Sequence, residues 1–308
     1  MTTPTASPAP RPPVFRTLSA NRHLLLFFGP CVAALLAVFL VPIWQTFVMS
    51  FHADKMGLDP AYVGMKNYAK IVSARNFGQL VWTSILYTLG NVVAVWVVGL
   101  GVALLLNRGF AGRALVRAAF IIPWATPYVA ASLIFALMMN YDVGVLNYLL
   151  GLASGGLLKI DFLTACPNAL ITLTGISVWK LMPLGIVMML SALQAIPASH
   201  YEAAHVDGAT GWQRFWYITL PGVRSTTVML TLLMMIWCFG RSFTAIYLLT
   251  GGGPAGCSNT IVLQSYQELF KLFHPGTASA LGVLVLLISV VFAGLYFLVL
   301  NRGTKHDA

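Results

Sequence analysis

Long apolar stretches alternate with short polar ones along the whole chain. Three of these stretches, residues 24–53, 76–107 and 272–301, contain no charged residue. Each is longer than the roughly 20 apolar residues that a helix needs to cross a bilayer. Three further stretches are almost as apolar, and none shows the alternation of a membrane β-strand. The pattern predicts an all-α polytopic membrane protein with six transmembrane helices, at residues 24–50, 80–106, 117–139, 168–193, 224–248 and 278–300.

The composition supports a membrane protein and excludes several other classes. Hydrophobic residues make up 58% of the chain and charged residues 8%, whereas charged residues make up about 25% of an average soluble domain. A soluble domain could not cover so much apolar surface, and a disordered chain would not contain it. Four cysteines in 308 residues exclude a disulfide-rich scaffold. The 18 Lys and Arg outnumber the 8 Asp and Glu but are dispersed, so the excess indicates membrane orientation rather than a nucleic-acid partner.

The basic residues predict on which side the ends of the chain lie. With both termini in the cytoplasm, ten of the 18 basic residues lie on that side, six lie on the opposite side, and Lys180 and Arg241 fall within spans. This bias favours cytoplasmic termini. We therefore predict a flexible, proline-rich tail at residues 1–22, a single transmembrane domain at 23–301 and a cytoplasmic tail at 302–308. A cleaved signal peptide is a weaker interpretation, because the first apolar run is too long for one.

The segment between the predicted fourth and fifth spans, residues 197–221, carries the clearest local signals. Two pairs of residues have the spacing of a capping box, Ser199 with Glu202 and Thr210 with Gln213. Gly208 between the two pairs is suited to end a helix in the left-handed conformation. These signals predict two short helices joined by a glycine turn, with Pro221 ending or kinking the chain that follows.

The same segment resembles the EAA loop of the permease subunits of ATP-binding-cassette importers. The matching positions are Glu202, Ala203, Ala204, Gly208, Ile218, Leu220 and Pro221. In that family the loop forms coupling helices that sit in a cleft of a cytoplasmic ATPase. The resemblance implies that these residues, together with Asp207, couple the chain to such an ATPase, with the glutamate as a polar anchor. The alternative interpretation is an ordinary loop helix in which Glu202 serves only the capping box.

Other segments extend the resemblance towards carbohydrate importers. Residues 120–127 and 178–183 are similar to the matching regions of sugar-type permeases, and residues 243–254 are similar to the LTxGGP signature of the MalF-like half of these importers. Thr244 stands where that signature usually has an acidic residue, which puts any role of the acid in doubt. The length of 308 residues resembles the compact six-span permeases for sugars and glycerol-3-phosphate rather than the larger maltose-type MalF proteins.

The resemblance also implies an assembly and a cargo. The partners would be a second, MalG-like permease, a cytoplasmic ATPase dimer that binds ATP and Mg²⁺, and an extracytoplasmic solute-binding protein. The location would be the cytoplasmic membrane of a bacterium or archaeon. The expected cargo is a sugar or a related polyol, with glycerol-3-phosphate as the non-sugar alternative.

Chemistry within the chain itself points away from catalysis. The sequence contains no phosphate-binding P-loop and no catalytic or metal-binding constellation, so we expect no cofactor and no ATP hydrolysis by this subunit. An ion-coupled secondary transporter is the rival class. Such a transporter would be expected to have internal repeats or carboxylates within the membrane, and the sequence shows neither.

Charged and aromatic residues within the spans are the candidates for the translocation pathway. A basic residue in mid-span costs about 2.5–3.5 kcal/mol on insertion scales, so it needs a compensating environment. Lys180 and Arg241 could therefore bind cargo, or each could pair with backbone carbonyls and fix the packing. Most aromatic residues in spans serve packing, but five could stack on sugar faces: Trp124, Trp179, Trp237, Phe243 and Tyr247.

Two further features concern packing and redox state. Gly90, Gly99 and Gly101 in the second span predict a close approach of another helix, because glycine lets two backbones come together. Cys166 and Cys257 fall in two predicted external segments. Their pairing is possible in an oxidising compartment and is left open by the sequence.

Overall fold

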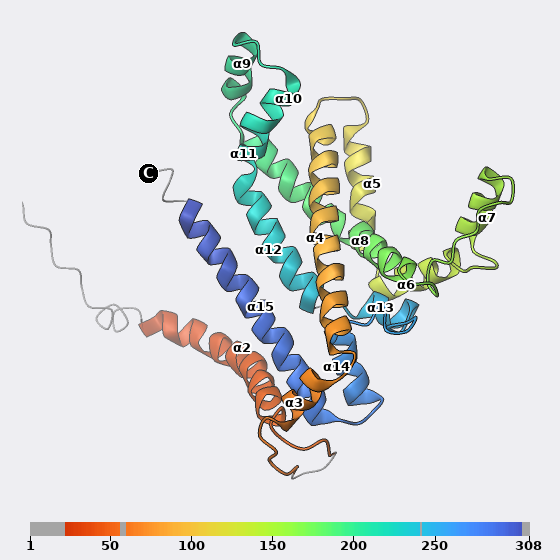
Figure 1. The fold of residues 1–308 in the computed structure, drawn as a ribbon. Coiled ribbons are helices and arrows are strands. Elements are labelled where there is room, and N and C mark those ends of the chain that lie inside the picture. Colours follow the sequence, from red (N-terminus) through yellow and green to blue (C-terminus); the bar gives the residue numbers. More distant parts are fainter. Residues whose placement is uncertain (1–21, 56–59, 241, 304–308) are drawn as a thin grey trace, which may run out of the picture.

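The computed structural model describes residues 22–55, 60–240 and 242–303, and every element named in them is a helix, apart from one isolated bridge between His52 and Tyr62 (Figure 1). Residues 1–21 and 304–308 of the predicted tails lie outside the described residues. The helices are, in chain order, α2 (Arg22–Met49), α3 (Lys66–Ser73), α4 (Phe77–Asn107), α5 (Arg113–Ala125), α6 (Tyr128–Met138), α7 (Val145–Ala153), α8 (Asn168–Ala195), α9 (Ala198–Val206), α10 (Gly211–Arg214), the π-helix η1 (Phe215–Thr219), α11 (Leu220–Gly222), α12 (Arg224–Gly240), α13 (Thr244–Leu249), α14 (Ile261–Phe270) and α15 (Pro275–Gly303).

Four of the described helices, α2, α4, α8 and α15, are long and apolar enough to cross a membrane. They match the first, second, fourth and sixth predicted spans to within a few residues. Two bent pairs would complete six spans if each crosses once: α5 with α6, bent by 97°, and the run α10–α11 with α12, bent by 62°. The all-α polytopic fold class is therefore confirmed.

The third predicted span, at residues 117–139, is wrong as one continuous helix. α5 ends at Ala125 and α6 begins at Tyr128. Pro127 has no N–H to continue the helical ladder, and its ring pushes the preceding residue towards extended backbone. Thr126 accordingly has ψ 131°. The break is a local consequence of one proline.

The fifth predicted span, at residues 224–248, is also interrupted. α12 ends at Gly240, and α13 begins only at Thr244. Inside a helix, glycine is less favourable than alanine by about 1 kcal/mol. The helix therefore loses less stability by ending at Gly240 than by ending at a neighbouring residue. Arg241, a candidate for the pathway, lies outside the described residues.

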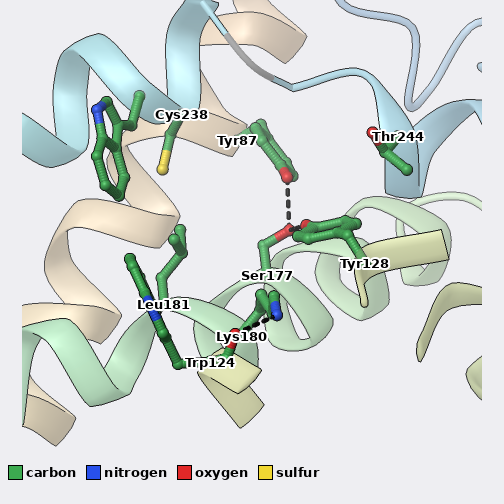
Figure 2. A pocket seen from close by; sticks show the side chains of 9 residues that line it. Tyr87, Trp124, Tyr128, Ser177, Lys180, Leu181, Cys238 and Thr244 are labelled. Carbon is green, nitrogen blue, oxygen red and sulfur yellow. Dashed lines mark hydrogen bonds between the residues drawn. The ribbon is translucent and has the colours of Figure 1, made fainter. Parts of the chain in front are cut away.

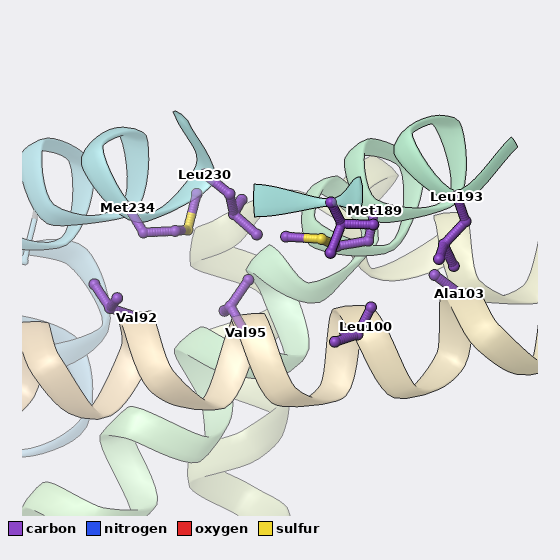
Figure 3. Packing of buried hydrophobic residues seen from close by; sticks show 9 residues of the cluster. Val92, Val95, Leu100, Ala103, Met189, Leu193, Leu230 and Met234 are labelled. Carbon is purple, nitrogen blue, oxygen red and sulfur yellow. The ribbon is translucent and has the colours of Figure 1, made fainter. Parts of the chain in front are cut away.

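α4, α8 and α12 form the core of the bundle, where their apolar side chains interdigitate (Figure 3). Val95 of α4 and Met189 of α8 are fully buried there. The two helices approach closely at Gly99 and Gly185, because a Cβ on Gly99 would lie 2.9 Å from the carbonyl carbon of Gly185. The packing prediction is thus confirmed for Gly99, and also for Gly90, where an added Cβ would lie 3.1 Å from the Thr174 side chain of α8. It is wrong for Gly101, where an added Cβ would meet nothing within 4 Å.

Contacts outside the core tie the remaining segments to the bundle. Figure 1 shows α9 and α10 at one end of the molecule, and α3 and α14 at the other. Cys166, just before α8, forms a disulfide with Cys257 in the loop before α14, and the two Cα atoms are 6.1 Å apart. The structure thus pairs the two cysteines whose state the sequence left open.

Candidate coupling loop and translocation pocket

The first helix of the candidate coupling loop, α9, begins two residues earlier than the capping pattern predicts. Its N-cap is Pro197, which makes no side-chain capping bond, so the predicted capping box of Ser199 and Glu202 is wrong. Ser199 lies inside the first turn and cannot cap it. Glu202 is exposed and makes no hydrogen bond or ion pair with any described residue. The carboxylate is therefore left available to another molecule.

Gly208 ends α9 as its sequence position predicts. Its φ is +75°, a left-handed conformation that costs other residues roughly 1–2 kcal/mol. The Gly208 amide donates to the His205 carbonyl over 3.1 Å, and the Ala209 amide donates to the Ala204 carbonyl over 2.9 Å. This pair of bonds is a Schellman motif, so the turn after α9 is sharply defined.

The second predicted capping box is present at the start of α10. The Thr210 amide donates to Gln213 Oε1 over 2.8 Å, and the Gln213 amide donates to Thr210 Oγ1 over 3.3 Å. A further bond, 3.0 Å between the Tyr201 and Thr219 hydroxyls, holds α9 against η1. The two short helices therefore form one unit with a fixed internal geometry.

The end of the loop connects this unit to the bundle. Leu220 packs against the apolar cluster of α4, α8 and α12, which contains the fully buried Val223. Ile218 is half-buried, whereas Pro221 is exposed. A displacement of α9 and α10 would consequently reach the core through Leu220.

Sequence reasoning missed a set of large apolar side chains that the loop exposes. Val206 is 88% exposed, Trp212 70% and Tyr217 80%. They surround the Gly208 turn in sequence, near the exposed Ala203. The sequence signal for this exposed surface is the presence of large apolar residues in short helices that have no core of their own. Such a surface is suited to burial against another protein.

The pathway candidates converge in part on one pocket of about 380 Å³ (Figure 2). It lies among α4, α5, α6, α8, α12 and α13, and its lining residues are Tyr87, Trp124, Tyr128, Ser177, Lys180, Leu181, Trp237, Cys238 and Thr244. The pocket thus contains three of the predicted candidates, Trp124, Lys180 and Trp237. It also contains Thr244, the residue that replaces the usual acid of the signature.

Lys180 is compensated by the backbone of the broken helix pair. Its Nζ donates to the carbonyls of Pro123 over 2.8 Å and Trp124 over 2.9 Å, and also to that of Thr126. An ammonium group has three donors, and all three are used here. The charge also lies at the C-terminal end of α5, where the helix dipole favours a cation. Lys180 therefore both lines the pocket and fixes the end of α5.

A group of hydroxyls in the pocket was not found from the sequence. The hydroxyls of Tyr87 and Ser177 lie 2.5 Å apart, and those of Tyr128 and Ser177 lie 3.0 Å apart (Figure 2). Tyr87 and Ser177 are buried, so Ser177 joins two tyrosines from different helices. The only signal in the sequence was a serine and two tyrosines within otherwise apolar stretches.

The aromatic candidates divide into two groups. Trp124 and Trp237 stack in the pocket, with ring centroids 6.0 Å apart and planes at 23°. Trp179 packs edge-on against Phe135 and does not line the pocket. Phe243 and Tyr247 also lie outside the pocket lining, and they stack on each other with centroids 5.1 Å apart.

The glycine-rich segment after α13 is a tight turn. Gly251 and Gly252 have φ of 60° and 94°. The Ser258 hydroxyl donates to the Gly253 carbonyl over 2.6 Å, and Gln267 Nε2 donates to the Gly251 carbonyl over 3.0 Å. Side chains from both sides therefore hold the turn in place.

The fold is that of a polytopic permease, a membrane subunit with an internal pocket and a loop that exposes large apolar side chains. Residues 96–305 match the family model of the binding-protein-dependent transport system inner membrane component. The chain belongs to this family, whose members are the membrane subunits of ATP-binding-cassette importers. Membership replaces the rival interpretation of an ion-coupled secondary transporter.

Individual relatives have cargoes of several kinds. The trehalose/maltose transport system permease protein MalF of Thermococcus litoralis is 32% identical over 272 residues, which cover 88% of this chain and 91% of the relative. The sulfoquinovosyl glycerol transport system permease protein SmoG of Agrobacterium fabrum is 32% identical, with 93% of each chain covered. The sn-glycerol-3-phosphate permease UgpA of the same organism is 28% identical, with 91% and 95% covered.

A solved structure shows the same fold. A permease chain in the crystal structure of a bacterial alginate ABC transporter, in complex with an alginate pentasaccharide-bound periplasmic protein, superposes with a TM-score of 0.81. The match covers 95% of this chain and 98% of that chain at 20% sequence identity. At this identity the comparison establishes the architecture of the bundle.

Proposed function

We propose that this chain forms one half of the translocation path of a carbohydrate importer and is coupled to a cytoplasmic ATPase through residues 197–221. The observation that carries the proposal is the exposed Glu202 carboxylate, which has no described partner and precedes the fixed turn at Gly208. The other partners are a second permease and an extracytoplasmic solute-binding protein. The ATPase dimer holds ATP and Mg²⁺, and this chain hydrolyses no ATP itself.

The pocket supports a sugar as the cargo. Trp124 and Trp237 offer aromatic faces, and the Tyr87, Tyr128 and Ser177 hydroxyls offer donors and acceptors of the kind that sugar hydroxyls need. The Lys180 ammonium has no donor left for an anion, which favours a neutral sugar over glycerol-3-phosphate. The trehalose/maltose relative agrees with this choice.

The disulfide supports the orientation with both termini in the cytoplasm. Disulfides persist on the extracytoplasmic side of the membrane, where the environment is oxidising. The Cys166–Cys257 bond lies just before α8, and the coupling loop follows the other end of this helix. With 28 residues, α8 is roughly 42 Å long and separates these two ends by a membrane thickness. The coupling loop would then face the cytoplasm.

Transport in this proposal is a change between two states of the bundle. When ATP closes the ATPase dimer, α9 and α10 move with it as one unit, because the Tyr201–Thr219 contact and the Gly208 turn fix their geometry. Leu220 transmits the displacement to the core of α4, α8 and α12. The pocket then opens alternately to the two sides of the membrane.

The coupling role is tested by Glu202→Lys in the complete transporter. We expect the variant to insert normally but to lose co-purification with the ATPase and to lose uptake, because the charge reversal places a cation where an anion anchors the loop. Asp142→Lys is the matched control, since Asp142 is an exposed acid between α6 and α7, outside the loop. Survival of both ATPase binding and uptake in Glu202→Lys would contradict the assignment.

The cargo is tested separately. A thermal-shift screen of the partner binding protein against neutral sugars and glycerol-3-phosphate identifies the ligand. Uptake of that ligand is then compared between Trp124→Ala and Trp179→Ala, and we expect the larger loss in Trp124→Ala because only Trp124 lines the pocket. Equal losses would remove the pocket from the pathway, and stabilisation by glycerol-3-phosphate alone would exclude the sugar.

A further inference from the structure

The N-terminal end of α5 carries positive charge that the described chain does not neutralise. Arg108 immediately follows α4, and Arg113 and Arg117 lie in the first two turns of α5. None of the three forms an ion pair with a described residue; the described pairs are Lys70–Asp54, Lys159–Asp142 and His274–Glu268. A helix N-terminus is itself the positive end of the helix dipole, so cations there are unfavourable unless an anion is close.

Arg117 is also short of hydrogen-bond acceptors. Its Nε and Nη2 atoms are enclosed by protein and have no hydrogen-bond partner among the described residues, and the Arg113 Nε atom is in the same condition. Buried donors of a charged group are costly to leave unpaired. Two of the three guanidinium nitrogens of Arg117 therefore still lack an acceptor among the described residues.

A pocket of about 210 Å³ lies beside Arg117, between α5 and α8. Its polar lining residues are Arg117, Ser191 and Gln194, and its apolar wall includes Phe120, Ile121 and Val187. Arg117 lies near the start of α5, and Ser191 and Gln194 lie near the end of α8, whereas Phe120, Ile121 and Val187 lie closer to the middle of the two helices. Ile121 and Val187 are 50% and 51% exposed, so the wall opens outward from the bundle.

We propose that this pocket binds the phosphate headgroup of an anionic phospholipid, with one acyl chain along Phe120, Ile121 and Val187. The guanidinium of Arg117 suits a phosphate because it offers several N–H groups in one plane. Basic pockets between transmembrane helices on the cytoplasmic side are typical sites for such headgroups. A free phosphate shares the headgroup chemistry but would leave the apolar wall unused. The site does not depend on what the protein transports, but its position on the cytoplasmic side rests on the orientation proposed above.

Native mass spectrometry of the intact transporter complex, delipidated and titrated with dioleoylphosphatidylglycerol, tests the proposal. Dioleoylphosphatidylcholine is the zwitterionic comparison. We expect the tightest phosphatidylglycerol site to weaken roughly fivefold in Arg117→Gln, the scale of one basic residue at an anionic surface. Arg224→Gln is the matched control, because Arg224 is an exposed arginine at the start of α12 and does not line the pocket. It should bind as the unaltered chain does.

A second variant tests the apolar wall, and two further measurements separate a lipid from a free anion and from another subunit. Val187→Trp fills the apolar wall without changing charge, and it should also weaken the phosphatidylglycerol site if the acyl chain lies there. Equal binding of the two lipids, or equal affinities in Arg117→Gln and Arg224→Gln, would overturn the proposal. The proposal would also be overturned if soluble glycerol phosphate competed with an affinity equal to that of the lipid, because the site would then bind a free anion. Photo-crosslinking from position 120 to another subunit rather than to lipid would overturn it as well.

Discussion

The Lys180 ammonium lies 2.8 Å from the Pro123 carbonyl and joins the middle of α8 to the last turn of α5. The same nitrogen also donates to the Trp124 and Thr126 carbonyls. These carbonyls have lost their helical partners because Pro127 interrupts the ladder. The charge that is costly in a span and the carbonyls left by the break thus compensate each other.

Replacing Lys180 by Met should therefore destabilise the bundle. The variant leaves three carbonyls at the helix break without a donor, and hydrogen bonds within membranes average about 0.6 kcal/mol each, so we expect a loss of about 1–3 kcal/mol. Thermal unfolding of the purified protein in detergent measures the effect. Lys159→Met is the control, because the contacts of Lys159 with Asp142 and the Tyr141 ring are exposed and their loss should change the midpoint little. Equal midpoints of the two variants would show that the carbonyl contacts contribute nothing.

The Gly99–Gly185 approach predicts opposite effects for two neighbouring glycines. In Gly99→Ala the new methyl group would lie 2.9 Å from backbone of α8, so α4 and α8 must separate, at a cost of about 1–3 kcal/mol. In Gly101→Ala the methyl group meets nothing within 4 Å, and the better helix propensity of alanine should leave stability unchanged or raise it by up to about 1 kcal/mol. The thermal midpoints of both variants test this prediction. A destabilisation in Gly101→Ala alone would contradict the close approach of α4 and α8 at Gly99.

The parts of the fold that sequence predicts are those set by local pattern. The lengths of apolar runs give α2, α4, α8 and α15, because a bilayer demands a minimum helix length. The Gly208 turn and the Thr210–Gln213 capping box are likewise fixed within a few residues. The break at Pro127 was also a local signal. The apolar residues continue on both sides of Pro127, however, and this pattern alone predicts one straight helix.

The parts that sequence cannot predict depend on which face of a helix meets which neighbour. Trp179 and Lys180 are adjacent in α8, yet only Lys180 lines the pocket. The Ser177 hydroxyl finds its two tyrosines on α4 and α6, far away in the chain. Apolar periodicity does not orient helices that are surrounded by lipid and protein alike, because both faces are apolar. The position of each of these side chains is set by tertiary packing.

The Cys166–Cys257 disulfide predicts the labelling pattern of the four cysteines. After denaturation without reductant, a thiol reagent should modify only Cys31 and Cys238, and prior reduction should add the other two. Because the bond closes a sequence separation of 91 residues, its removal should lower stability by about 2–4 kcal/mol. Thermal midpoints of the protein with and without reductant measure this, with Cys31→Ser as the control. Labelling of all four thiols before reduction would contradict the pairing.

Asp54 should make the extramembrane end of the bundle sensitive to acid. Its Oδ1 accepts from the Thr277 amide and its Oδ2 from the Thr277 hydroxyl, both over 2.7 Å, while Lys70 Nζ donates to Oδ2 over 2.8 Å. Burial alone would raise the pKa of Asp54, but the hydrogen bonds from Lys70 and Thr277 outweigh it and lower the pKa below its ordinary value. The ionised carboxylate is thus the form that holds the loop after α2 to the first turn of α15.

Because the folded-state pKa of Asp54 lies below the unfolded value of about 3.9, the unfolded chain binds the proton more readily. The contribution of Asp54 to stability should therefore be fully present above roughly pH 4–5. It should be lost as the pH falls through the lowered pKa. Asp54→Asn should cost about 1 kcal/mol at pH 7, and its thermal midpoint should approach that of the unaltered protein as the pH falls towards 3. Asp142→Asn is the control, because the Asp142 side chain is 80% exposed and its ion pair is weak. A constant gap between Asp54→Asn and the unaltered protein across this range would contradict the role of the charged carboxylate.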